Sequence, residues 1–255
     1  MKYILEVCLV ALALTTTSPV AAQSPAVPAP PSSAASWDGS LNVAAQPPQT
    51  TQQGIGVQLP AAGSAAPMPD ADQEGSLIVT VTGDGTVYFG VDPVNPAALA
   101  EKIRESLSNL PEKPLYIKAD ARTPYANVLK VLEALRSASV NATILLTGHQ
   151  VSSHEGTAVP PYGLAVRVGP PQLFGSGTTT VQLLNSVQRP PTLKINGEDT
   201  SWAALQSRLS QPAQNRSERV VLVDADGTLP FSDVVSVIDV CRSTGTQVVL
   251  VTPEL

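Results

Sequence analysis

The 255-residue sequence is poor in charged, aromatic and cysteine residues. Charged residues make up 14% of it, against about 25% in an average soluble protein. Aromatic residues make up only 4%, so a folded core must consist mainly of aliphatic side chains. Cys8 and Cys241 are too few for a disulfide framework or a multi-cysteine zinc site. The 21 acids exceed the 15 bases, which excludes the strongly basic surface typical of nucleic-acid binding.

Long hydrophobic runs are also missing. The N-terminal apolar run, from Tyr3 to Leu14, is interrupted by Glu6 and is shorter than the roughly 20 residues of a membrane-spanning helix. Lys2 precedes the run and small residues follow it, which is typical of a signal peptide cleaved before Gln23. We predict a signal peptide over residues 1–22 and a periplasmic protein. The alternative is an uncleaved inner-membrane anchor, in which Glu6 would be the candidate proton carrier.

Residues 23–75 have the composition of a linker. They contain nine of the 24 prolines and no Lys or Arg, and they show no apolar periodicity. Such a segment buries too little surface to offset its ordering entropy. We therefore predict a disordered Pro/Ala-rich linker over residues 23–75.

An internal repeat organises the rest of the chain. Residues 115–138 align without a gap to residues 221–244, and seven of the aligned positions are identical. The matched residues are Ala119, Asp120, Pro124, Val128, Val131, Arg136 and Ser137 with Ala225, Asp226, Pro230, Val234, Val237, Arg242 and Ser243. Each copy is preceded by two short strand patterns and a helix pattern, and it is followed by an apolar run that ends in Thr.

The repeat predicts an α+β fold with two tandem β-β-α-β-α-β domains. Each domain is a small mixed sheet with two helices on one face, and the domains pack as a pseudo-dimer. The predicted domains are residues 76–147 and 176–255. Residues 148–175 form an interdomain segment, in which residues 162–168 have the pattern of an extra strand.

Four features resemble the periplasmic domain of the ExbD/TolR biopolymer transport family: the Ala-Asp motif, the Pro-aromatic pair that follows it after three intervening residues, the Val-rich helix and the closing Leu/Val-Thr strand. The resemblance covers most of residues 76–147 and 178–252. It implies a non-enzymatic protein that binds or scaffolds in the envelope, as an accessory of an ExbB-ExbD-TonB or Tol-like system or associated with peptidoglycan. It implies no cofactor. The alternative within the family is a membrane-anchored subunit of a proton-driven motor. The tandem arrangement and the short N-terminal run depart from the family pattern.

Four residues are candidate binding residues. Asp120 and Asp226 follow strands that precede helices, a position where ligand sites occur in α/β sheets. The competing interpretation is that each carboxylate closes its turn by accepting backbone N–H groups. Tyr125 and Phe231 come next to the helix starts, where a ring can either pack on the core or face a partner.

Two further chemical motifs carry little weight. Residues 220–229 resemble the Asp-x-Asp-Gly-Thr signature of haloacid-dehalogenase-type phosphatases, with Asp224 as nucleophile and Asp226 as acid/base. Too few residues follow for the rest of that fold, and the aligned copy has Lys118 at the position of Asp224. His149 and His154 lie in one segment, but solvated histidines are far commoner than metal ligands, so no metal site is expected.

Overall fold

The computed structural model describes residues 55–110, 113–149, 161–174, 178–187, 189–210 and 219–253. All of these belong to one compact unit, Gln46–Leu255. The predicted signal peptide, with Glu6, and the linker as far as residue 54 lie outside the described residues.

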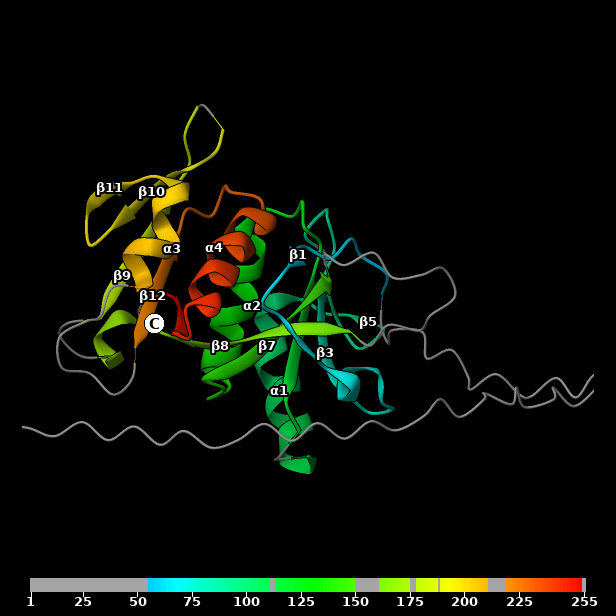
Figure 1. Cartoon of the computed structure of the whole chain (residues 1–255). Coiled ribbons are helices and arrows are strands. Elements are labelled where there is room, and N and C mark those ends of the chain that lie inside the picture. The colour runs from blue at the N-terminus through cyan, green and yellow to red at the C-terminus, as the bar shows by residue number, and fades with distance from the viewer. Residues whose placement is uncertain are drawn as a thin grey trace, which may run out of the picture. The chain divides into compact units, whose positions relative to one another are not determined.

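Two copies of one element order make up the described chain (Figure 1). The first contains β3 (Leu77–Val81), β4 (Val87–Phe89), β5 (Asp92–Pro93), α1 (Pro96–Asn109), β6 (Leu115–Ala119), α2 (Tyr125–Ser137) and β7 (Ala142–His149). The second contains β9 (Thr179–Leu184), β10 (Thr192–Ile195), β11 (Glu198–Thr200), α3 (Trp202–Ser210), β12 (Val220–Ala225), α4 (Phe231–Ser243) and β13 (Gln247–Val251). The predicted α+β class with tandem copies is therefore confirmed, and each copy has one additional short strand, β5 or β11.

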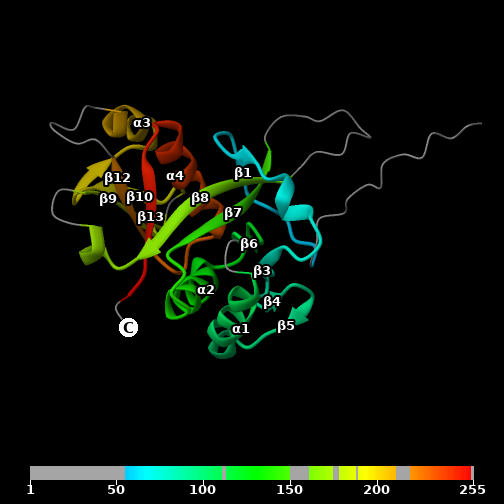
Figure 2. The same ribbon diagram turned by 90° about the horizontal axis from the view of Figure 1, so that it is seen from below.

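A single sheet runs through both copies. Its strand order is β11-β10-β9-β12-β13-β8-β7-β6-β3-β4-β5, so the two halves are arranged alike on either side of β8 (Tyr162–Gly169). This central strand is antiparallel to β7 and parallel to β13 (Figure 2). The extra strand predicted over residues 162–168 is thus confirmed. It occupies the inner edges of both half-sheets, which would otherwise expose unpaired backbone groups.

One apolar core joins all four helices to one face of this sheet. Every second strand residue points into it, for example Val79, Ile117 and Val223, and α2 lies beside α4. Asn95 caps the first helix by accepting the backbone N–H of Ala97 at 3.0 Å, and Pro96 is the first residue of that helix. Cys241 is fully buried, and this burial raises the pKa of its thiol to about 12.

The structure corrects the predicted linker boundary. Residues 55–75, here called the strap, lie against the sheet instead of extending away from it. They form β1 (Ala61–Ala62), which pairs with β7, then β2 (Ala66–Pro67), which pairs with β8, and the short 3-10 helix η1 (Pro69–Asp72). Ala71 is 1% exposed and packs on the sheet face opposite the helices, in a cluster with Ile78, Tyr116 and Leu146. The strap's small, non-periodic apolar residues give no pattern that a sequence reading could detect.

The predicted interdomain segment needs a similar correction. Besides β8 it contains a second 3-10 helix, η2 (Pro171–Phe174). This helix ends five residues before β9, just as η1 ends five residues before β3. The two 3-10 helices therefore occupy matching places, each just before the first strand of its copy.

Gly163 provides a test of the strap's packing. A Cβ at this position would lie 2.5 Å from Ile144 Cγ2 and 3.0 Å from Met68 Cγ in the strap. We expect Gly163→Ala to lower the free energy of unfolding by about 1–3 kcal/mol in urea titrations, because the crowded site must shift. The matched control is Gly148→Ala, whose Cβ would meet only ordinary contacts at 3.9 Å or more and should change stability by less than about 0.5 kcal/mol. Equal effects of the two substitutions would contradict this packing.

Candidate functional site: the strand-to-helix turns

Both candidate carboxylates close the turn that follows their strand. The backbone N–H of Arg122 donates to Asp120 Oδ1 at 3.0 Å, and that of Thr228 donates to Asp226 Oδ1 at 2.8 Å. An acceptor two residues before its donor is the geometry of an Asx turn. The structure thus gives each carboxylate the turn-closing role that was one of the two predicted interpretations.

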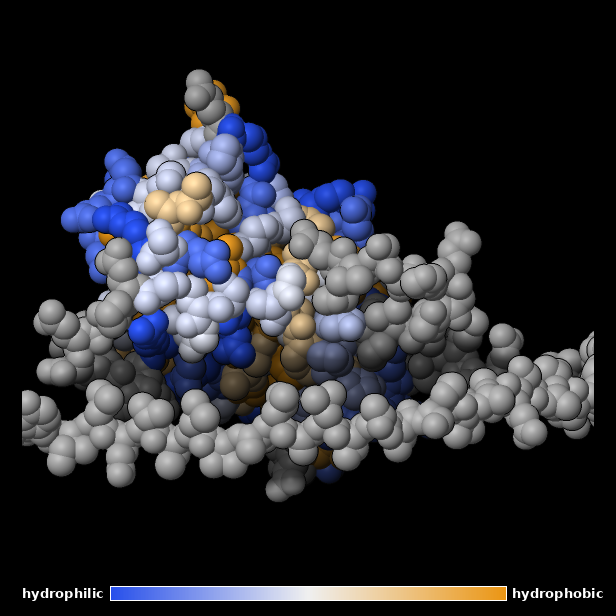
Figure 3. Space-filling view, viewed as in Figure 1, coloured by the Kyte–Doolittle hydropathy of each residue, from blue (hydrophilic) through white to orange (hydrophobic). Residues whose placement is uncertain are grey.

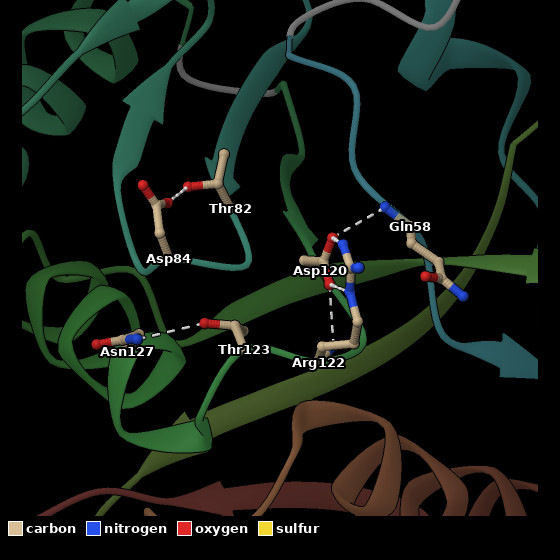
Figure 4. Close-up of polar contacts among 7 residues, drawn as sticks. All are labelled: Gln58, Thr82, Asp84, Asp120, Arg122, Thr123 and Asn127. Carbon is tan, nitrogen blue, oxygen red and sulfur yellow. Dashed lines mark hydrogen bonds and ion pairs between the residues drawn. The ribbon is translucent and has the colours of Figure 1, made fainter.

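Asp120 is held much more tightly than Asp226. It is 3% exposed, and it accepts two side-chain N–H bonds from Arg122 at 2.9 Å each and one from the backbone of Gln58 in the strap at 3.2 Å (Figure 4). The Arg122 side chain is the main reason that the pKa of Asp120 lies well below its ordinary value. Asp226 is half-buried and has Thr228 as its turn partner, whose backbone and hydroxyl lower its pKa.

The hairpin between β3 and β4 lies beside the first turn (Figure 4). There Asp84 accepts bonds from the backbone and hydroxyl of Thr86, at 3.2 and 3.1 Å, and from the hydroxyl of Thr82. Asn127 donates to Thr123 Oγ1 at 3.3 Å. These polar groups satisfy one another, and the part of the chain that the structure describes contains no group of three His, Cys, Asp or Glu side chains able to hold a metal ion.

Tyr125 and Phe231 lie in the core, at 1% and 0% exposure. Neither ring can contact a ligand in this arrangement, because both are enclosed by the packing of the two copies. Their candidacy as direct binding residues is therefore corrected by the structure. Burial is the main cause that raises the pKa of Tyr125, and the negative charge of Asp224 adds to it.

The backbone at these aromatic residues joins the copies. The N–H of Tyr125 donates to the carbonyl of Leu229 at 2.7 Å, and the N–H of Phe231 donates to the carbonyl of Thr123 at 2.9 Å. One residue further on, Ala126 donates to Gly227 at 2.8 Å. In the same way, Ser232 donates to Ala121 at 3.0 Å, and Pro124 and Pro230 form an antiparallel bridge between these bonds.

These four bonds, here called the junction, are reciprocal. Each donor and acceptor in one copy has its aligned counterpart in the other copy as acceptor and donor, which is the property of a two-fold contact. The first N–H groups of a helix have no partner within that helix. In this chain the first two N–H groups of α2 and of α4 find their partners in the other copy. Side-chain patterns do not predict the junction, because its partners are backbone atoms; the only trace of it in the sequence is the repeated Ala-Asp and Pro positions.

Asp224 and the two histidines take no part in the junction. Asp224 is exposed, with Gln182 Nε2 at 3.5 Å, while Asp226 is engaged by Thr228, so the two carboxylates have different partners. His149 ends β7, and His154 lies outside the described residues. Among the helices that the structure describes, none is long and apolar enough to cross a membrane.

The pH dependence of stability tests the role of Asp120. Its pKa is lowered in the folded protein, so its contribution is complete at neutral pH and is lost as the pH falls below the unfolded value, near 3.8. We expect Asp120→Asn to lower the free energy of unfolding by about 2 kcal/mol at pH 7, from the loss of charge-assisted hydrogen bonds. The difference from the wild type should shrink between about pH 5 and pH 2 in denaturant titrations. Asp226→Asn, in the more exposed turn, is the control and should cost less; an equal loss in both variants would contradict the assignment.

One known protein family matches most of the chain. The family described as "Biopolymer transport protein ExbD/TolR" matches residues 4–150 and 157–254. No curated protein matches the chain. The first matched stretch includes the first copy of the structure, and the second stretch, which begins before β8, includes the second copy. The chain belongs to the ExbD/TolR family of biopolymer transport proteins.

Proposed function

We propose that this chain is a non-enzymatic periplasmic scaffold that presents a linked pair of ExbD/TolR-type domains to an envelope transport system. The partners would be components like ExbB and TonB, or their Tol counterparts, with peptidoglycan as a further binding surface. The observation that carries the proposal is the junction, in which the two copies exchange four backbone hydrogen bonds within one chain. A covalent connection keeps two such domains at high effective concentration, so the pair needs no second chain.

The outer edges of the sheet are unfavourable for binding a partner strand. The edge strands are two or three residues long and contain Asp92-Pro93 on one side and Glu198-Asp199 on the other, which discourages addition of a partner strand. Over α3 and α4, hydrophilic and near-neutral residues predominate and the hydrophobic areas are small (Figure 3).

The membrane-anchored motor subunit is the second candidate. The family match starts at residue 4 and so includes the N-terminal apolar run with Glu6. In that case the chain would face the periplasm from the inner membrane, and Glu6 would be the group to test as proton carrier. The phosphatase alternative has no support from the family match, and Asp226, its proposed acid/base, is engaged in its own turn.

Fractionation of the native host distinguishes these candidates. With the full-length gene carrying a C-terminal tag, we expect the chain in the periplasmic fraction with an intact mass that begins at Gln23. A full-length chain in the inner membrane would favour the anchored subunit instead.

Cross-linking in the same cells tests the scaffold role. We expect the tagged chain to cross-link to an ExbB-, TonB- or Tol-like protein. Gly227→Val should reduce that yield severalfold, since a Cβ at Gly227 would lie 3.1 Å from Ala126 Cβ and would force the junction apart. Gly56→Ala, where a Cβ meets nothing within 4 Å, is the control. A chain that cross-links to none of these proteins and does not sediment with purified cell wall would overturn the proposal.

A further inference from the structure

A pocket of about 380 Å³ lies across four neighbouring strands of the sheet. Its lining comes from the beginnings of β6 and β7, the middle of β8 and the beginning of β13, together with Arg242 near the end of α4. These strands lie side by side in the order β6-β7-β8-β13 (Figure 2). The volume is in the range of small-molecule pockets, and most of the lining surface is apolar. We call it the cross-strand pocket.

The two ends of the cross-strand pocket differ in polarity. At the β6 and β7 end the lining side chains are apolar except for Thr143, whose hydroxyl already donates to the carbonyl of Leu115 at 2.8 Å. At the β8 and β13 end the lining includes Arg167, Arg242 and Gln247. Neighbouring strands are about 4.8 Å apart, so the lining spans about 14 Å from β6 to β13. A ligand that fills this length therefore needs an apolar body and one polar end.

The polar end of the cross-strand pocket is positively charged. Arg167 and Arg242 line it, and no acidic residue lines the pocket. Within the part of the chain that the structure describes, neither arginine forms an ion pair with a carboxylate. The guanidinium of Arg167 lies 5.1 Å from the centre of the Phe174 ring, and Arg242 Nη1 donates to the carbonyl of Thr246 at 3.3 Å. These contacts leave both guanidinium groups with further N–H donors for an anionic ligand.

The lining offers few partners to a ligand with many polar groups. Sugars and nucleotides would leave most of their hydrogen-bonding groups unpaired against it, which is costly. A peptide would bring a backbone N–H and C=O with each residue. The strand backbone in the middle of the pocket is already paired, since Ile144 of β7 lies between Tyr116 of β6 and Ala165 of β8 in the ladders. A hydrocarbon chain needs no such partners, and its removal from water is favourable.

We propose that the cross-strand pocket binds a single-chain amphiphile with a terminal carboxylate, the chemistry of a fatty acid. The hydrocarbon chain lies over Ala142 and Ile144, and the carboxylate lies at the end that Arg167 and Arg242 line. The site is separate from the junction and does not rest on the proposed function, so its failure would leave that function in place.

Titration of the full chain with dodecanoate, below the concentration at which it forms micelles, tests the proposal. Followed by NMR, dodecanoate should shift the signals of Ala142 and Ile144, and butyrate, which lacks the long chain, should not. Dodecyltrimethylammonium, whose chain ends in a cation, should bind at least about tenfold more weakly than dodecanoate. Arg167→Gln and Arg242→Gln should each weaken dodecanoate binding about tenfold, the loss of one charge-assisted contact. Arg104→Gln, which removes an exposed arginine of α1 outside the lining, should leave binding unchanged.

Three results would overturn the proposal. One is the absence of shifts at Ala142 and Ile144 with dodecanoate just below its micelle concentration. Another is binding of dodecyltrimethylammonium with the same affinity as dodecanoate, which would make the pocket an apolar surface without preference for an anion. The third is full affinity for dodecanoate in the variant that carries both arginine substitutions. Unchanged circular dichroism of the variants shows that a lost signal is not a loss of fold.

Discussion

The arrangement of the two copies depends on the first backbone N–H groups of α2 and α4. A helix leaves these groups without partners of its own, and burying them unpaired is costly. Here each helix donates them to carbonyls in the opposite turn, at 2.7 to 3.0 Å, and Tyr125 and Phe231 are buried at the same place. Separating the copies would therefore expose two aromatic rings, each worth about 1.5–3 kcal/mol of burial, together with four unpaired donors. The junction thus couples the backbone and core energetics of both copies.

This constraint accounts for the sheet and the strap. When the two turns face each other, the inner strands β7 and β13 run in opposite directions. The strand β8 lies between them and pairs antiparallel to β7 and parallel to β13. The strap then crosses between the copies. Its Gly63 and Ser64 donate backbone N–H bonds to the carboxylate of Asp239 on α4, at 2.9 and 2.7 Å, while its η1 lies on the first copy's half of the sheet. The chain segment preceding each copy is thus used to stabilise the pair.

Features that depend on residues close together in the chain could be predicted from the sequence. The helix patterns of the repeat and the turn-closing role of Asp120 and Asp226 depend on residues close in sequence. The strap and the junction were not predictable in this way. The strap has the composition of a linker, and it is held by contacts such as Gln58 with Asp120 that span long stretches of chain. The junction uses backbone atoms, which leave no side-chain signature. Tyr125 could not be assigned to core or surface from the sequence, since that depends on whether the second copy packs over it.

Amide hydrogen exchange at the junction tests the central claim most directly. The N–H groups of Tyr125, Ala126, Phe231 and Ser232 would normally exchange as freely as any helix start. If the copies are held together as described, all four are protected and exchange with one common free energy of opening. Exchange of these amides at the rates of unprotected helix starts, with the helix interiors still protected, would contradict the account, because it would show that each copy folds without the other's turn.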